Sequence, residues 1–192
     1  MNECKCWYCT KMKWPLIRQI SSEYNWVEIP KNGSSSIKEH IGSRAHVVKD
    51  VRITERPVLC FVRHPIARFI SVFNHYFADN KESRYQRGID FFTRMGHDIN
   101  KFSIEERVDF LIQHFEHLNY KDECHHFYPQ SYFVNGINNL EIYDVSHIND
   151  MFPDITSYNV SRNGIRTLSD ENSEWVLTHY KSDIELYKQR LK

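Results

Sequence analysis

Residues 27–41 read Val27-Glu28-Ile29-Pro30-Lys31-Asn32-Gly33-Ser34-Ser35-Ser36-Ile37-Lys38-Glu39-His40-Ile41, an order that indicates a strand, a tight turn and the start of a helix. Gly33 allows a backbone conformation that other residues resist, and the serines that follow it can cap the helix. Such a turn brings backbone N–H groups and the positive end of a helix dipole to one point, which favours a phosphate or a sulfate. Taken alone, the stretch can also be a polar loop before a capped helix.

A second strand-to-helix junction follows at residues 57–73. Pro57–Arg63 is a continuous apolar run that ends in a charge, which predicts a strand buried on both faces, as in a parallel sheet. Pro65 suits the first turn of the next helix, where its missing N–H costs nothing. Arg63 would then lie at the carboxyl end of its strand, and Ser71 about two turns into the helix, so both could bind a second phosphate. Without a ligand, they are an arginine at a strand end and a serine on a helix flank.

The order of the remaining elements decides the fold class. Strands and helices alternate along the chain, which predicts an α/β fold: a three-layer sandwich with a central parallel sheet and the phosphate-binding loop between its first strand and helix. Residues 1–24 are predicted to be an N-terminal lead-in and residues 25–192 a single domain. The predicted elements are strands at 25–29, 57–63 and 140–145, helices at 34–41, 65–77, 103–118 (opened by a Ser103–Glu106 capping box), 146–151 and from Ser169 onward, a polar surface excursion at 79–101, and a buried helical stripe of Ile66, Phe69, Ile70, Phe73 and Phe77.

Composition and charge disfavour several classes of protein. The 192-residue chain carries 25 basic and 25 acidic residues, and this zero formal net charge argues against a general nucleic-acid binder. No run approaches the ~18 apolar residues of a membrane span, and the N-terminus has no signal-peptide core, so the sequence predicts a cytoplasmic chain without a membrane span. Cys4, Cys6 and Cys9 are closely spaced, but no second pair follows, so we interpret them as free thiols and predict no metal.

Two motifs carry a resemblance to a known family. Pro30–Ile37 resembles the Pro-Lys-x-Gly-[Ser/Thr]-[Ser/Thr]-Ser loop of sulfotransferases that use 3′-phosphoadenosine 5′-phosphosulfate (PAPS), and Val62–Phe73 resembles their Arg-x-Pro-x-x-Arg-[Phe/Leu]-x-Ser-x-[Tyr/Phe] segment. His126–Gln130, Asn159–Arg162 and Tyr180–Tyr187 are similar to segments of the carbohydrate branch, which includes Golgi-type uronyl 2-O- and chondroitin sulfotransferases. The resemblance covers about residues 25–191, and the first 24 residues carry none of it.

The resemblance implies an enzyme that moves a sulfuryl group from PAPS, as co-substrate, to a hydroxyl of an acceptor, and it favours a carbohydrate acceptor. Lys31 would neutralise the charge that develops on the leaving oxygen. The residues implied to bind the 5′-phosphosulfate end of PAPS are Lys31, Asn32, Gly33, Ser34, Ser35 and Ser36, and those implied to bind its 3′-phosphate are Arg63 and Ser71.

The general base is left open among several residues. Histidine suits the task near neutral pH. His46 occupies roughly the position at which the uronyl 2-O-sulfotransferase branch has its base, and His126 comes from the Pro-Gln motif. His40 and Glu39 lie on the first helix, where a glutamate-using branch would place its base. We rank His46 above His126 as the catalytic residue and interpret His64 as structural.

Two other functions compete with this interpretation. One is a non-catalytic nucleotide- or anion-binding module that kept the phosphate loop and lost its base. The other is a nucleotide kinase, which is disfavoured because the loop lacks Gly-Lys-[Ser/Thr] and no clear magnesium carboxylate follows an apolar strand.

Overall fold

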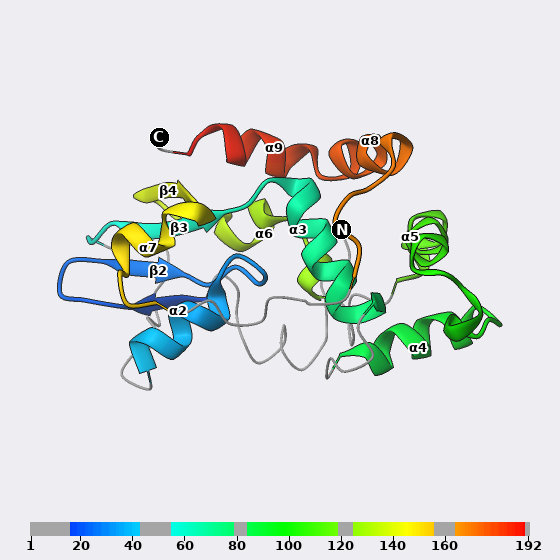
Figure 1. Ribbon diagram of the computed structural model, residues 1–192. Helices are drawn as coiled ribbons and strands as arrows, with labels where there is room; N and C mark the ends of the chain where they lie inside the picture. Colours follow the sequence, from blue (N-terminus) through cyan, green and yellow to red (C-terminus); the bar gives the residue numbers. More distant parts are fainter. Residues whose placement is uncertain (1–15, 43–54, 79–83, 119–124, 156–163, 191–192) are drawn as a thin grey trace.

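A single four-stranded sheet lies at the centre of the protein, whose computed structural model describes residues 16–42, 55–78, 84–118, 125–155 and 164–190 (Figure 1). The strand order is β1-β2-β3-β4, in which β2 (Asn25–Val27), β3 (Val58–Val62) and β4 (Leu140–Asp144) run parallel. β1 (Ile17–Gln19), from the predicted lead-in, adds an antiparallel edge strand beside β2. The predicted α/β fold with a mainly parallel sheet is confirmed.

Helices cover both faces of the sheet, because all of β3 is buried and its side chains alternate between two cores. Cys60 faces a core that α6 and α9 complete, and Phe61 faces the opposite core, which α2 and α7 complete. These helices are α2 (Ser34–Ile41), α6 (Gln130–Val134), α7 (Ile148–Met151) and α9 (Lys181–Lys188).

A third core, rich in aromatic side chains, lies beside the sheet. Here α3 (Pro65–Phe73) and its π-helical continuation η2 (Asn74–Ala78) pack with three further helices. The rings of Phe92 and Phe110 stack in this core with centroids 4.5 Å apart. The three helices are α4 (Tyr85–Arg94), α5 (Ile104–Gln113) and α8 (Asp170–His179), as the right-hand part of Figure 1 shows.

The prediction of a surface excursion at residues 79–101 was wrong. The described part of that range contains α4, which buries Phe91 and Phe92. Gly88 belongs to the predicted excursion but lies inside this helix, where a Cβ would come within 2.2 Å of the Tyr76 carbonyl oxygen. The glycine therefore permits close packing of two helical segments.

Several helix boundaries follow the predicted signals. α2 has the predicted bounds, and Gly42 ends it with its N–H on the Lys38 carbonyl. The capping box is confirmed, because the Ser103 hydroxyl accepts from the Glu106 N–H at 3.2 Å and the Ser103 N–H donates to the Glu106 carboxylate at 2.7 Å. The last predicted helix is divided at Tyr180 into α8 and α9. The 3₁₀ segments are η3 (Ile99–Lys101), η4 (Phe115–His117), η5 (His125–Phe127) and η6 (Val145–His147).

None of the helices in the described ranges combines the length and the apolar character that crossing a bilayer requires.

Candidate functional site

The turn between β2 and α2 has a constrained backbone. Lys31 adopts a left-handed conformation with φ 68°, and Gly33 does so with φ 75°. A Cβ on Gly33 would also come within 2.3 Å of the Ile148 Cδ1 atom, so another residue here would strain the backbone and displace the end of the Ile148 side chain. The N-cap residue of α2 is Gly33, not one of the predicted serines, and it has no side chain with which to cap the helix. An anion bound at this turn would interact favourably with the positive end of the α2 dipole.

Asn32, predicted to contact PAPS, is turned into the protein instead. Its side chain is buried, and its Nδ2 donates to the Phe61 carbonyl oxygen at 2.9 Å and to the Gln130 Oε1 at 2.5 Å. These bonds join the turn to the end of β3 and to the start of α6. The side chain of Asn32 thus shapes the turn, and a contact of this side chain with a ligand is not supported.

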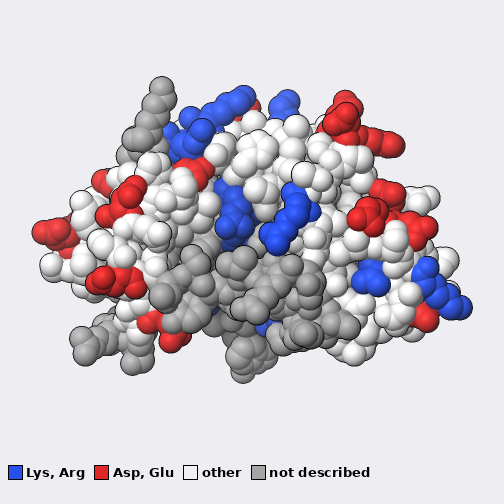
Figure 2. Space-filling model, in the orientation of Figure 1, with Lys and Arg blue, Asp and Glu red and all other residues white. Residues whose placement is uncertain are grey.

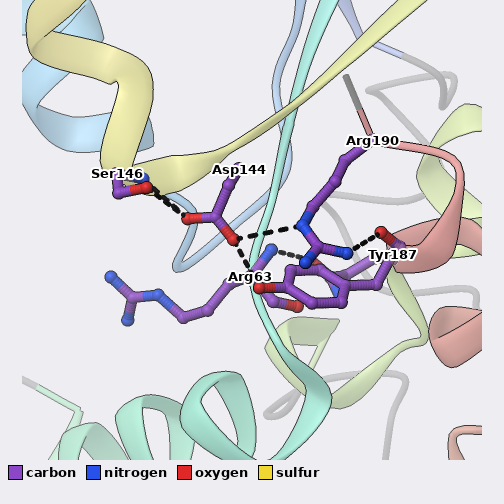
Figure 3. A network of polar contacts seen from close by, with 6 residues as sticks. Arg63, Asp144, Ser146, Tyr187 and Arg190 are labelled. Carbon is purple, nitrogen blue, oxygen red and sulfur yellow. Dashed lines mark hydrogen bonds and ion pairs between the residues drawn. The ribbon is translucent and has the colours of Figure 1, made fainter. Parts of the chain in front are cut away.

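Arg63 follows the carboxyl end of β3, beside a network of polar contacts at the end of β4. In that network the Asp144 carboxylate accepts hydrogen bonds from the Tyr187 hydroxyl at 2.6 Å and from the Ser146 hydroxyl at 2.8 Å. Figure 3 shows the Arg63 guanidinium extending away from these groups. Burial lowers the pKa of Arg63, and the charge of Asp144 partly counters this effect. The guanidinium hydrogen-bonds to no other described residue, so it is available for an anionic ligand.

One cavity of about 1110 Å³ brings the two junctions together. Lys31, Gly33 and the serines of α2 line it, and so do Arg63 and Ser71. Ile66 and Ile70, predicted to be buried, line it as well, because the face of α3 that carries Ser71 is turned toward the opening. Further lining comes from residues that no sequence motif had marked: Asn74, His75, Arg84, His125, Ile165 and Arg166.

The cavity has a cationic character. Among the described residues that line it, Glu28 alone is acidic, and its carboxylate is paired with Arg18 at 3.2 Å and with Lys38 at 2.8 Å. Figure 2 shows basic side chains at the middle of this face of the molecule and acidic ones toward its sides. A surface of this kind attracts a polyanionic ligand.

Comparison with known protein families matches residues 21–189 to the Sulfotransferase family, a range that includes both junctions. The chain is a member of the sulfotransferase family. It matches no curated protein and no solved structure. Membership implies transfer of a sulfuryl group to a hydroxyl-bearing acceptor, in agreement with the cationic character of the cavity.

Arg68, the second arginine of the Val62–Phe73 motif, is buried beneath the site and connects its segments. Arg68 is 2% exposed, and its guanidinium donates to the carbonyl oxygens of Tyr128 at 2.9 Å and His126 at 2.8 Å, with a longer contact of 3.3 Å to that of Pro30. Burial lowers the pKa of Arg68. The second arginine of the motif therefore ties the phosphate loop to the segment before α6.

The carboxyl-terminal motif of the sulfotransferase has a similar structural role. The Tyr180 hydroxyl donates to the Phe127 carbonyl oxygen at 2.8 Å. The buried Asp183 carboxylate accepts from the backbone N–H groups of Gln130 at 2.8 Å and Ser131 at 2.9 Å, and so caps α6. These contacts place the Pro-Gln segment against the site.

Three histidines, His75, His125 and His126, gather on one side of the cavity. Burial and nearby cations lower the pKa of His75 to about 3 and that of His125 to about 4. The pKa of His126 also lies well below its usual value, first because of burial and then because of the neighbouring histidines and Lys31. The Nδ1 atom of His126 lies 3.0 Å from the Tyr76 hydroxyl oxygen. All three rings are therefore neutral near pH 7.

The other candidate bases lie elsewhere. His46, ranked first from the sequence, is outside the described residues. Glu39 and His40 are exposed on α2 and do not line the cavity, and the ring of His40 contacts that of Phe152. His64 precedes α3 as its N-cap residue, lies at the cavity and packs edge-on against the ring of Tyr187.

The sequence prediction of free thiols concerns Cys4, Cys6 and Cys9, which lie outside the described residues. Within the described ranges, no group of His, Cys, Asp and Glu side chains is arranged to hold a metal ion. Cys60 is buried in β3, and burial raises the pKa of its thiol, so it packs as an apolar side chain.

Proposed function

We propose that this sulfotransferase moves the sulfuryl group of PAPS to a hydroxyl of a carbohydrate acceptor. The observation that carries the proposal is one cavity whose lining includes Lys31, Gly33, the three serines at the start of α2, Arg63 and Ser71. PAPS carries anionic groups at both ends, a 5′-phosphosulfate and a 3′-phosphate, and so matches two cationic sites on one cavity. A volume of about 1110 Å³ leaves space for an acceptor beside it.

In this reaction the acceptor oxygen bonds to sulfur, while the bond between sulfur and the bridging phosphate oxygen breaks. The hydroxyl proton passes to a base, and the products are a sulfate ester and 3′,5′-adenosine bisphosphate. We assign to Lys31 and to the N–H groups at the start of α2 the neutralisation of charge on the bridging oxygen. Lys31→Ala should then lower the single-turnover rate more than the affinity for PAPS, and an unchanged rate would refute this role.

The base is proposed to be His46, with His126 as the second candidate. The cavity supports the candidacy of His126, because its ring is neutral and can accept a proton at Nε2 when Nδ1–H donates to Tyr76. Lys31 contributes to the low pKa of His126. A bound polyanion would offset that positive charge and raise the pKa, so the ring becomes a stronger base when the sulfuryl donor is present.

The proposal is tested by thermal unfolding with 3′,5′-adenosine bisphosphate and, as the control, ATP with magnesium. A ligand at ~100 times its dissociation constant adds about 2.7 kcal/mol to the free energy of unfolding, which gives a clear rise in Tm. Stabilisation by ATP-magnesium alone would favour a kinase instead. Stabilisation by the bisphosphate, without sulfate transfer from labelled PAPS to any of a panel of sugars, would indicate a non-catalytic module.

A further inference from the structure

The side-chain amide of Gln130 is completely buried between two segments that we propose bind anions. One is the phosphate loop between β2 and α2, and the other is the end of β3 at Arg63. Its Oε1 accepts from the Asn32 Nδ2 at 2.5 Å and from the Arg63 backbone N–H at 2.9 Å, and its Nε2 donates to the Arg63 carbonyl oxygen at 2.8 Å. One side chain thus holds the phosphate loop on one side and the backbone of Arg63 on the other.

The partners of this amide allow only one orientation. The Arg63 N–H must face an acceptor and the Arg63 carbonyl must face a donor, so Gln130 cannot be flipped. Asn32 is fixed as well, because its Nδ2 lies between two acceptors, the Phe61 carbonyl and the Gln130 Oε1. The Asn32 Oδ1 is left buried with no hydrogen-bond partner among the described residues. A buried oxygen without a hydrogen-bond partner is destabilising, so Asn32 keeps its contact with Gln130 at the expense of stability.

Gln130 is itself anchored through its backbone. Its N–H donates to the Asp183 carboxylate at 2.8 Å, and Asp183 is 1% exposed. Because α9 carries Asp183, this contact attaches Gln130 to the helix layer of the fold.

We propose that Gln130 is a positioning residue that sets the separation between the phosphate loop and Arg63, and so makes the site selective for ligands with anionic groups at both ends. This inference rests on the proposed function. Two subsites held at a matching distance bind a two-ended ligand more tightly than two loose subsites, because less ordering is needed on binding. A one-ended ligand does not use the separation and gains little from it.

The test replaces Gln130 with methionine, which has a similar shape and makes none of the three hydrogen bonds. Dissociation constants are measured by calorimetry for 3′,5′-adenosine bisphosphate, adenosine 5′-monophosphate and adenosine 3′-monophosphate. We expect the bisphosphate to bind about tenfold more weakly or worse, and each monophosphate to change by less than about threefold. An unchanged ratio between bisphosphate and monophosphate affinities would overturn the inference.

Tyr180→Phe is the matched control. It removes the hydrogen bond from the Tyr180 hydroxyl to the Phe127 carbonyl oxygen, in the segment that leads into α6, and it leaves the three side-chain hydrogen bonds of Gln130 in place. It should lower the Tm and leave the affinity ratio unchanged. A shift of the ratio in this variant equal to that of Gln130→Met would show that general loosening of the segment is responsible, and would overturn the specific role of the amide.

Gln130→Glu provides a second test should the methionine variant fail to fold. A protonated glutamate can accept from Arg63 N–H and donate to its carbonyl, as glutamine does, whereas the ionised form cannot donate. Relative to the wild type at each pH, its affinity ratio should be low at pH 8 and recover toward pH 5.5. A ratio equal to that of the wild type at both pH values would overturn the inference. If the wild-type chain fails to bind the bisphosphate, both the proposed function and this inference fall, whereas wild-type binding with unchanged variant ratios removes this inference alone.

Discussion

Arg63→Ala should weaken binding of the sulfuryl donor while leaving the fold nearly unchanged. The guanidinium forms no hydrogen bond with another described residue, so the substitution leaves no polar group of the protein without its partner. Asp144, whose charge lies near it, keeps its bonds to Tyr187 at 2.6 Å and to Ser146 at 2.8 Å. The lost electrostatic contact is of the partly exposed kind, which contributes about 0–1 kcal/mol to the free energy of unfolding.

The effect on binding should be larger than the effect on stability. A hydrogen bond to a charged group contributes about 1.5–3 kcal/mol, which corresponds to a loss of affinity of about 10- to 150-fold for 3′,5′-adenosine bisphosphate. Arg63→Lys keeps the charge but loses the planar fork, so its affinity should lie between those of the wild type and Arg63→Ala.

Calorimetric titration with two ligands separates the roles of the subsites. Adenosine 5′-phosphosulfate lacks the 3′-phosphate, so its affinity should change little in Arg63→Ala. Equal weakening of both ligands would refute the assignment of Arg63 to the 3′-phosphate. A loss of several kcal/mol in urea unfolding would instead show that Arg63 acts through the fold.

Three further predictions concern the loop and the histidines. Gly33→Ala should lower the free energy of unfolding by about 1–3 kcal/mol more than Gly42→Ala in urea titrations. Both glycines have positive φ, but of the two only Gly33 has a neighbouring atom where a Cβ would lie. Equal losses in the two variants would exclude a steric contribution from the contact with Ile148. If His46 is the base, His46→Ala should cut turnover by ~100- to 10,000-fold and remove the acid limb of the kcat/KM profile, whereas His126→Ala should mainly raise the acceptor KM; the reverse result would reverse the ranking, and two intact acid limbs would exclude both. Because burial holds the pKa of His75 at about 3, the unfolded chain binds more protons than the native state below pH ~6.5, so stability is full above that value and is lost as pH falls toward 3. His75→Asn should therefore flatten the fall of Tm between pH 7 and pH 5, and an unchanged slope would contradict this.

The sequence correctly predicted those parts of the protein whose causes are local. The bounds of α2, the capping box at Ser103 and the buried strand β3 follow from neighbouring residues, so a single pass along the chain is enough to predict them. The two strand-to-helix junctions, which we propose bind anions, were likewise predictable, because each is a continuous motif in the sequence. Their meeting at one cavity followed from the rule that parallel strands present their carboxyl ends at the same edge of a sheet.

Contacts between distant parts of the chain decided the rest. Asn32 and Gln130 lie 98 positions apart, and only the folded protein shows that the asparagine points inward to meet the glutamine. Asn74 donates to the Ile165 carbonyl oxygen across 91 positions. Arg166, which follows Ile165, lines the cavity. Gly88 resembles a loop residue in sequence because its cause, the Tyr76 carbonyl against which it packs, belongs to another helical segment.

The sequence alone therefore determined the fold class and the family, and it marked the two strand-to-helix junctions that line the cavity, since these depend on short-range pattern. Only the tertiary structure determined which motif residues line the cavity and which are buried beneath it. Arg63 and Arg68 belong to one motif, but the first lines the cavity and the second is buried among carbonyl oxygens. The physical reason is that the burial of a side chain and its hydrogen-bond partners depend on how the layers pack. The residues next to it in the sequence do not determine them.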